Sequence, residues 1–437
     1  MFNRAIAYSL ALKAWQSTAG LIGIYLIIRY YSPSLQGFYY TFNSLIALQL
    51  FVELGLYLVI TNIASHEWAK LNLSENGSIT GDQAALSRLV SLGRFIFKWY
   101  AAASFILWIV AGIAGYLFLD QSNVQEINWK LPWFVQITLS SMLFLFTPFL
   151  SLLEGCNQVK EVAKFRFWQS FSSSIIFWFS IIGGANLWAA PILSSITLIS
   201  TAYYLIILKK TFFLPFYTQP QSECISWKSE ILPMQWRLAL QGLMSYFGFY
   251  IFTPVMFYYY GPEVAGQMGI SQQIVMAIVS ISLIWVTTKV PQFGILVAKR
   301  NFVKLDNEWF RASLYSAALM IAGVFLLLSL QMILNKIEWS PILRLLPPLP
   351  LLCLCIGAFF VVLIQCLAMY LRAHKREVLT TSGVLTAVMI GSLVWVFGSK
   401  FGPTGAAGGY LLVMACFAFP ATVVIYLKSR KNWHQLQ

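Results

Sequence analysis

Long apolar segments separated by short polar ones run through this chain from end to end. A membrane-spanning helix needs about 20 mainly apolar residues, and on that scale the pattern predicts twelve segments. They cover residues 10–30, 37–63, 93–119, 131–154, 165–183 and 187–208, then 233–257, 265–288, 311–334, 347–370, 378–398 and 404–427. The runs are too long for strands, and their lengths suit helices. The sequence therefore predicts an all-α polytopic membrane protein with twelve transmembrane helices.

The predicted spans fall into two equal groups. Six precede the Lys209-Lys210 pair, and six follow a more polar connector. We expect an N-terminal six-helix lobe at 1–210, a cytoplasmic connector at 211–232, and a C-terminal six-helix lobe with a short cytoplasmic tail at 233–437. The three largest connectors (64–92, 209–232 and 289–310) are all too short to hold a sizeable domain.

A short sequence near the start of the chain occurs again in the second half. Tyr30-Tyr31-Ser32-Pro33-Ser34-Leu35-Gln36-Gly37 returns 229 residues later as Tyr259-Tyr260-Gly261-Pro262-Glu263-Val264-Ala265-Gly266, with four identical positions. Lys160-Glu161-Val162 and Arg376-Glu377-Val378 match more weakly, each after the fourth span of its half. Because both pairs fall on matching sides of the membrane, we expect two bundles related by an axis along the membrane normal, around a central cleft.

Composition and charge agree with a membrane protein. Charged residues make up only 10% of the chain and hydrophobic residues 59%, whereas soluble domains carry about 25% charged residues. With the N-terminus inside, alternating loops place 24 Lys and Arg on the cytoplasmic side and 5 outside, which favours two cytoplasmic termini. The net charge of +14 therefore follows from topology, and loops this short leave no room for a nucleic-acid-binding domain.

Motifs of enzymes, metal sites and secretion signals are missing from the sequence. No phosphate-binding loop, HExxH or GxSxG pattern occurs, so no catalytic residue, metal or cofactor is predicted. The six cysteines form no CxxC pair and mostly lie in apolar segments, where they are packing residues. Lys13 interrupts the first apolar run without a cleavage site after it, which indicates an uncleaved first helix.

Polar residues inside the predicted spans are the candidate functional groups, because such residues are costly in a bilayer and face a cavity or the bundle interior. They form helical stripes on three spans: Lys13, Gln16, Ser17 and Gly20; Gln49, Glu53 and Tyr57; and Arg237, Gln241 and Ser245. A fourth span adds the polar residues Gln267, Ser271, Gln272 and Gln273. For Lys13, Arg237 and Lys289 a second interpretation stays open, in which they snorkel to the headgroups. Glu53 lies about ten residues from either end of its span and is harder to explain in that way.

Several local stretches resemble the polysaccharide flippases (Wzx-type, for O-antigen or exopolysaccharide) of the multidrug/oligosaccharidyl-lipid/polysaccharide exporter superfamily. They are residues 33–42, from Pro33 to Phe42, the Leu50-Phe51-Val52-Glu53-Leu54-Gly55-Leu56 stretch, Ala64-Ser65-His66-Glu67-Trp68, and Leu152-Leu153-Glu154-Gly155-Cys156-Asn157. The six-plus-six layout extends the resemblance over the whole chain.

The resemblance implies an alternating-access transporter that moves an undecaprenyl-diphosphate-linked oligosaccharide across the bacterial inner membrane. It implies that Lys13, Arg237 and Arg29 stabilise the diphosphate and that glutamines contact sugar hydroxyls, with candidates Gln16, Gln49, Gln241, Gln272 and Gln273. Glu53 is the candidate for ion coupling. Implied partners are membrane lipid, a polysaccharide polymerase and chain-length proteins.

Three other classes are alternatives. A drug/cation antiporter of the same superfamily would favour several buried carboxylates, and Glu53 is the one clear intramembrane acid in the sequence. A major-facilitator transporter would carry a basic Gly/Asp/Arg-rich turn, which is absent from residues 64–92. A polysaccharide polymerase or ligase would need a catalytic external loop, and the longest predicted ones (119–131 and 335–346) are short.

Overall fold

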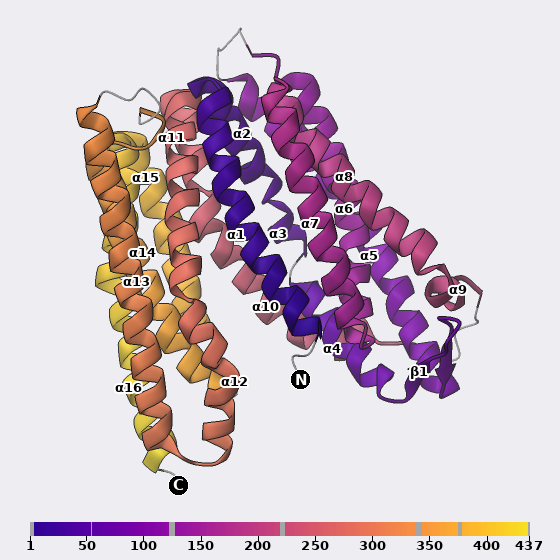
Figure 1. Ribbon diagram of the computed structural model, residues 1–437. Coiled ribbons are helices and arrows are strands. Elements are labelled where there is room, and N and C mark those ends of the chain that lie inside the picture. The colour runs from indigo at the N-terminus through magenta and orange to yellow at the C-terminus, as the bar shows by residue number, and fades with distance from the viewer. Residues whose placement is uncertain are drawn as a thin grey trace. The chain divides into compact units, whose positions relative to one another are not determined.

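The computed structural model describes residues 4–53, 55–121, 127–218, 223–337, 343–374 and 378–435 (Figure 1). Contacts divide the chain into two units. The first unit is Met1–Leu35 with Leu45–Gly242, and the second is Gln36–Ser44 with Leu243–Gln437. Two helices pass from one unit to the other, α2 (Pro33–Ile46) and α10 (Leu232–Ser245).

The first unit is a helical bundle with one small hairpin. Its other elements are α1 (Arg4–Tyr30), α3 (Gln49–Glu53), α4 (Leu56–Trp68), β1 (Leu71–Leu73), β2 (Ile79–Gly81), α5 (Gln83–Asp120), α6 (Lys130–Gly155), α7 (Val159–Ile182), the short η1 (Asn186–Trp188), α8 (Ala189–Tyr203), the π-helix η2 (Tyr204–Leu208), α9 (Lys210–Thr218) and the π-helix η3 (Trp227–Ile231). In the antiparallel hairpin Asn72 lies opposite Thr80.

Ring packing and a close approach between helices stabilise this bundle. Trp15 of α1 packs on Phe171 of α7 with ring centroids 4.6 Å apart. Gly155 of α6 approaches α4 so closely that a side chain there would overlap Ala64 and the backbone of Thr61. Helices in a membrane associate through such close packing, since the lipid removes the hydrophobic driving force between them.

The second unit contains the remaining helices. They are the π-helix η4 (Tyr246–Tyr250), α11 (Phe252–Ser282), α12 (Ile284–Ala298), α13 (Phe302–Lys336), α14 (Pro348–Ala373), α15 (Thr380–Val413), the π-helix η6 (Met414–Ala418) and α16 (Phe419–Gln435). The long helices α11 and α15 are each interrupted by a glycine with positive φ, Gly261 (83°) and Gly402 (63°), which is followed by a proline. Both interruptions fall in gaps between predicted spans.

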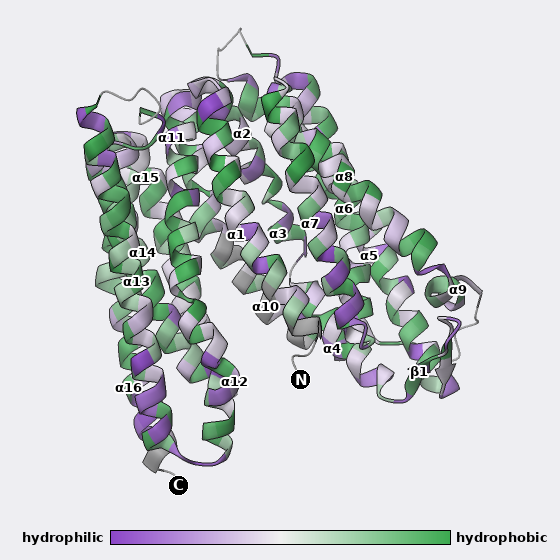
Figure 2. Ribbon diagram, in the orientation of Figure 1, coloured by the Kyte–Doolittle hydropathy of each residue, from purple (hydrophilic) through white to green (hydrophobic). Residues whose placement is uncertain are grey.

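The expectation of an all-α polytopic membrane protein is confirmed. Over the described ranges, eight helices are long and apolar enough to cross a membrane, or nine if the bent pair Pro33–Glu53 and Leu56–Trp68 is one span. The number of spans, twelve, stays a prediction. Figure 2 shows apolar residues along the helices of each unit, with polar residues more frequent toward their ends.

Two of the predicted connectors contain regular secondary structure. Residues 289–310 are almost entirely helical, because α12 reaches Ala298 and α13 begins at Phe302, with Arg300 at φ 53° in the tight turn between them. Residues 64–92 include the hairpin β1–β2 and the first turns of α5, whose N-terminus is capped by the Asp82 carboxylate accepting from the Ala85 N–H.

The duplicated corners pack against each other inside the second unit. The Gln36 amide donates to the Gly266 carbonyl at 2.8 Å, and the Tyr40 hydroxyl donates to Gln273 at 2.6 Å. Tyr40 also lies against Gly269, which is 229 positions further along and therefore its equivalent in the repeat. Contact between equivalent positions is what a two-fold axis produces.

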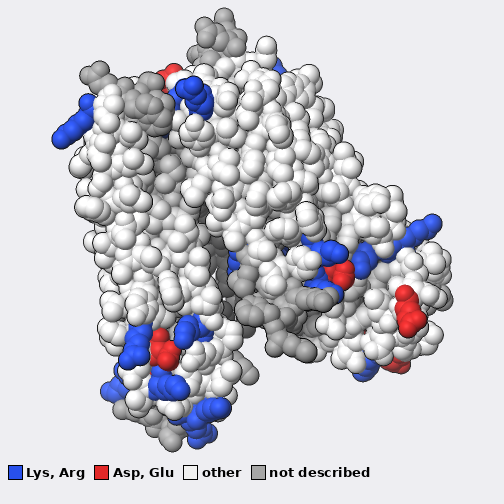
Figure 3. Space-filling view, in the orientation of Figure 1, with Lys and Arg blue, Asp and Glu red and all other residues white. Residues whose placement is uncertain are grey.

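Charged side chains gather toward an end of each unit (Figure 3). In the second unit Lys289 pairs with Glu308 at 3.0 Å, and Arg430 pairs with Asp306 at 2.5 Å. In the first unit Arg88 pairs with Glu67 at 2.8 Å and with Glu230 at 2.6 Å. The last of these pairs attaches η3 to the start of α5.

Candidate functional site

The second predicted span is broken in the middle of its length. Helix α3 ends at Glu53, Gly55 has the left-handed conformation (φ 65°, ψ 16°), and α4 begins at Leu56 with a bend of 46°. The prediction of one continuous helix that carries Gln49, Glu53 and Tyr57 on one face is therefore wrong. A glycine reaches this conformation without the steric penalty that other residues meet. Irregular backbone at membrane depth is tolerated where it is buried in protein or lines a cavity.

Glu53 is the carboxylate at this break. It is half-buried, and α3 packs on α5. Its carboxyl lies within electrostatic range of the hydroxyls of Tyr57 and of the buried Tyr100 on α5. An acidic group next to interrupted helix backbone and phenolic hydroxyls can accept a proton or face a cation, which is the chemistry expected of an ion-coupling group.

Three residues of the predicted polar stripe on α1, Lys13, Gln16 and Ser17, are exposed. Lys13 and Gln16 are exposed, whereas Trp15, which lies between them in the sequence, packs on α7. Arg29 is also exposed but occupies the last turn of α1. At 1.5 Å per residue it lies roughly 24 Å from Lys13 along the helix axis. One diphosphate therefore cannot contact both side chains at once, as the sequence-based assignment of Lys13 and Arg29 to the same group would need.

The remaining predicted residues differ in their surroundings. Gln49 is half-buried at the first position of α3. The Gln272 amide donates to the carbonyl of Phe249 at 3.3 Å, and Gln273 accepts from Tyr40, so both glutamines have packing partners. The side chains of Arg237 and Gln241, on α10, lie outside the described part of the structure. Their roles toward a substrate stay predictions.

A cavity in the second unit was not predicted from the sequence. Its volume is about 530 Å³, and it is bordered by η4, α11, α14, α15, η6 and α16. Tyr250 and Tyr410 contribute rings with hydroxyls, and Gln365 and Arg372 contribute polar groups from α14. Two π-helices border this cavity, and such bulges occur frequently at functional sites.

Two polar residues that line this cavity could have been identified from the sequence. Gln365 is a polar residue inside the predicted span 347–370, and Arg372 follows seven positions later on the same helical face. The two π-helices could not be predicted, because no side-chain pattern marks the extra residue in a helical turn. The cavity combines aromatic rings, hydroxyls, an amide and a guanidinium, a set that suits a sugar or an anionic group.

Comparisons with known proteins find likeness in structure alone. No family model matches the sequence, and no curated protein matches it. The fold is similar to the lipid II flippase MurJ in an inward closed conformation (TM-score 0.68, 14% identity, 98% of this chain and 87% of MurJ). It is also similar to an inward-facing multidrug resistance MATE family transporter of the MOP superfamily (TM-score 0.63, 12% identity, 98% of each chain).

A further similar structure is that of the MATE multidrug transporter DinF-BH (TM-score 0.64, 12% identity, 100% of this chain and 97% of that one). At such identities the likeness concerns architecture and not substrate. The chain has the fold shared by MATE transporters and the lipid II flippase MurJ.

Proposed function

We propose that this protein is a flippase of the MOP superfamily that moves an undecaprenyl-diphosphate-linked oligosaccharide, an O-antigen or exopolysaccharide repeat unit, across a bacterial inner membrane. The observation that carries the proposal is the fold shared over 98% of the chain with MurJ, which is named a lipid II flippase. The local resemblance to polysaccharide flippases points the same way. In this proposal residues 1–210 and 233–437 are the two lobes, 211–232 connects them, and both termini are cytoplasmic.

In this proposal, different residues contact different chemical groups of the cargo. The diphosphate is anionic, and the exposed ammonium of Lys13 and the guanidinium of Arg237 would stabilise it. Sugar hydroxyls need hydrogen-bond partners and ring faces, which the exposed Gln16 and the aromatic cavity of the second unit offer. The polyprenyl tail stays in the bilayer throughout. Glu53, at the break in the second span, couples the transition to an ion gradient.

A drug/cation antiporter is the second candidate, favoured by the likeness to MATE transporters. Organic cations require carboxylates in the binding region, and Glu53 is the candidate there. A multidrug cargo would also suit the aromatic lining of the second-unit cavity through cation–π contacts. The basic residues Lys13 and Arg237 oppose a cationic cargo, which is why the lipid-linked anion is the first candidate.

The deciding experiment compares lipids and surface polysaccharide in a strain lacking the gene. Mass spectrometry of lipid extracts would be run beside staining of surface polysaccharide, with the wild-type gene restored on a plasmid as control. Polyprenyl-diphosphate-linked oligosaccharide that accumulates inside, with loss of surface polysaccharide, would support the flippase. Unchanged glycolipids together with raised sensitivity to cationic drugs would instead support the antiporter.

A further inference from the structure

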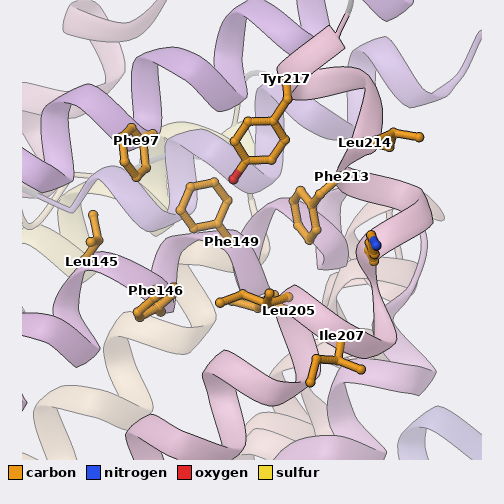
Figure 4. Close-up of a pocket in the computed structure, with 11 residues that line it drawn as sticks. Phe97, Leu145, Phe146, Phe149, Leu205, Ile207, Phe213, Leu214 and Tyr217 are labelled. Atoms are coloured by element: carbon orange, nitrogen blue, oxygen red, sulfur yellow. The ribbon is translucent and has the colours of Figure 1, made fainter.

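An apolar groove runs along the first unit between four elements. Its volume is about 580 Å³, within the range of about 300–1,000 Å³ that small-molecule sites occupy. Figure 4 shows aromatic rings from α5, α6 and α9 in this groove, with Phe149 between Phe97 and Phe213 and next to Tyr217. Leu205 and Ile207 from η2 complete the lining. The surface is apolar except for Lys210 and the Tyr217 hydroxyl.

Helix α9 gives this groove its polar edge. Lys210, Phe213, Leu214 and Tyr217 follow at i, i+3, i+4 and i+7, so they share one face of the helix, and all four line the groove. Lys210 is exposed, and Tyr217 is 84% exposed. An apolar stripe with a basic residue at one end is the pattern of a helix that lies in the membrane interface.

The opposite face of α9 is fixed to the bundle. Phe212 and Phe216 are buried. Gly93 of α5 approaches the Phe216 ring so closely that a Cβ there would overlap it. The Arg94 guanidinium donates to the Phe216 carbonyl at 2.8 Å near the C-terminus of α9, where a cation is favourable. The groove is therefore preformed and does not depend on its occupant to order it.

We propose that this groove is a binding site for an anionic phospholipid of the membrane leaflet in which α9 lies. One acyl chain occupies the space between Phe97, Phe149 and Phe213, and the phosphate meets the Lys210 ammonium. Charge complementarity identifies the occupant, because the Lys210 ammonium attracts an anionic headgroup more strongly than a zwitterionic one. Tyr217 stands at the level of the headgroups, where tyrosine is favoured.

The test is lipid binding by the purified, delipidated full chain, measured by native mass spectrometry. Phosphatidylglycerol and phosphatidylcholine with identical acyl chains are offered in equal amounts. We expect preferential retention of phosphatidylglycerol, and an affinity about five-fold lower for it in Lys210→Gln, which is what one basic residue near the surface contributes. Phosphatidylcholine binding should not change in that variant.

Two further variants separate the groove from general surface charge. Lys164→Gln removes an exposed lysine on α7 and should bind as wild type does. Leu145→Trp fills the groove and should reduce retention of both lipids. Equal retention of the two lipids by the wild type, or unchanged affinity in Lys210→Gln, would overturn the proposal. Displacement of phosphatidylglycerol by polyprenyl diphosphate would also overturn it, by assigning the groove to the cargo.

Discussion

Gly37 shows at the scale of one residue how the duplicated corners fit together. A Cβ at this position would overlap the Pro262 carbonyl oxygen, so segment 36–44 reaches α11 only because residue 37 has no side chain. We expect Gly37→Ala to destabilise the fold by about 2 kcal/mol, the usual cost of overpacking. The measurement is the thermal or denaturant midpoint of the purified protein.

Gly20→Ala is the matched control for that substitution. Both glycines are helical, but a Cβ on Gly20 meets no atom within 4 Å. Alanine is favoured over glycine inside a helix by about 1 kcal/mol, so this variant should be neutral or slightly more stable. Equal midpoints for the two variants would mean that the Gly37 contact does not contribute to stability.

Glu53 is the residue on which the coupling proposal depends. Glu53→Gln keeps the size of the side chain and one acceptor oxygen, and it removes the charge and the site that takes up a proton. We expect export of the lipid-linked oligosaccharide to fall at least tenfold, which corresponds to about 1.4 kcal/mol in the barrier, with normal accumulation in the membrane. Surface polysaccharide per unit of membrane protein gives the readout. Wild-type export in this variant would remove Glu53 from the coupling mechanism.

Arg237 distinguishes binding of the diphosphate from snorkelling to the headgroups. Arg237→Lys keeps the charge, whereas Arg237→Ala removes it, and a charge-assisted hydrogen bond to phosphate contributes about 1.5–3 kcal/mol. We therefore expect export to fall more in the alanine variant than in the lysine variant. Normal export by both variants would assign Arg237 to the headgroup region.

At the scale of single elements, helix type was predictable from the sequence and helix continuity was not. The apolar runs located α5, α6 and α13 within a few residues or turns, because length and hydropathy determine a membrane helix. The break at Gly55 was not predicted, since a lone glycine inside an apolar run is equally compatible with an unbroken helix. The π-helices η4 and η6, which border the cavity of the second unit, were missed for a different reason, because no side-chain pattern marks the extra residue per turn. The stripe of Lys13 and Gln16 was predictable because it depends on helical periodicity alone.

The short helix η3 provides a prediction about pH. The Ser226 N–H donates to Glu230, and Arg88 pairs with it, so the pKa of this carboxyl lies below its ordinary value of 4.5. A carboxyl with a depressed pKa in the folded state stabilises that state above its unfolded pKa, and the stabilisation is lost as pH falls through the folded value.

We therefore expect wild type to exceed Glu230→Gln in unfolding free energy at pH 7, by about 0.5 kcal/mol because the pair is partly exposed. Below pH 4.5 the difference should shrink toward zero. This difference is measured from the melting temperatures of both proteins across about pH 3–7, the range in which carboxyls titrate. A difference independent of pH would mean that the Glu230 charge does not hold η3 in place.

At the scale of the whole molecule, the repeat and the charge distribution make one consistent topology. Tyr40 meets its own equivalent, Gly269, in the second unit, and the sequence predicts halves related by an axis along the membrane normal. Halves related in this way have the same orientation, so each must contain an even number of spans. The 24-to-5 distribution of basic residues between alternate loops requires the same parity.

This topology can be tested with one native cysteine and one introduced cysteine. Cys224 is exposed in the predicted cytoplasmic connector, and Asn128 is exposed in a predicted external loop. A membrane-impermeant maleimide should label Cys224 in inverted vesicles but not in spheroplasts, and Cys224→Ser should abolish that signal. Asn128→Cys should react from the outside. Three predicted spans separate the two positions, so labelling from the same side would show that the span count between them is wrong. Labelling of both from the side opposite to the one expected would keep the count and invert the whole protein in the membrane.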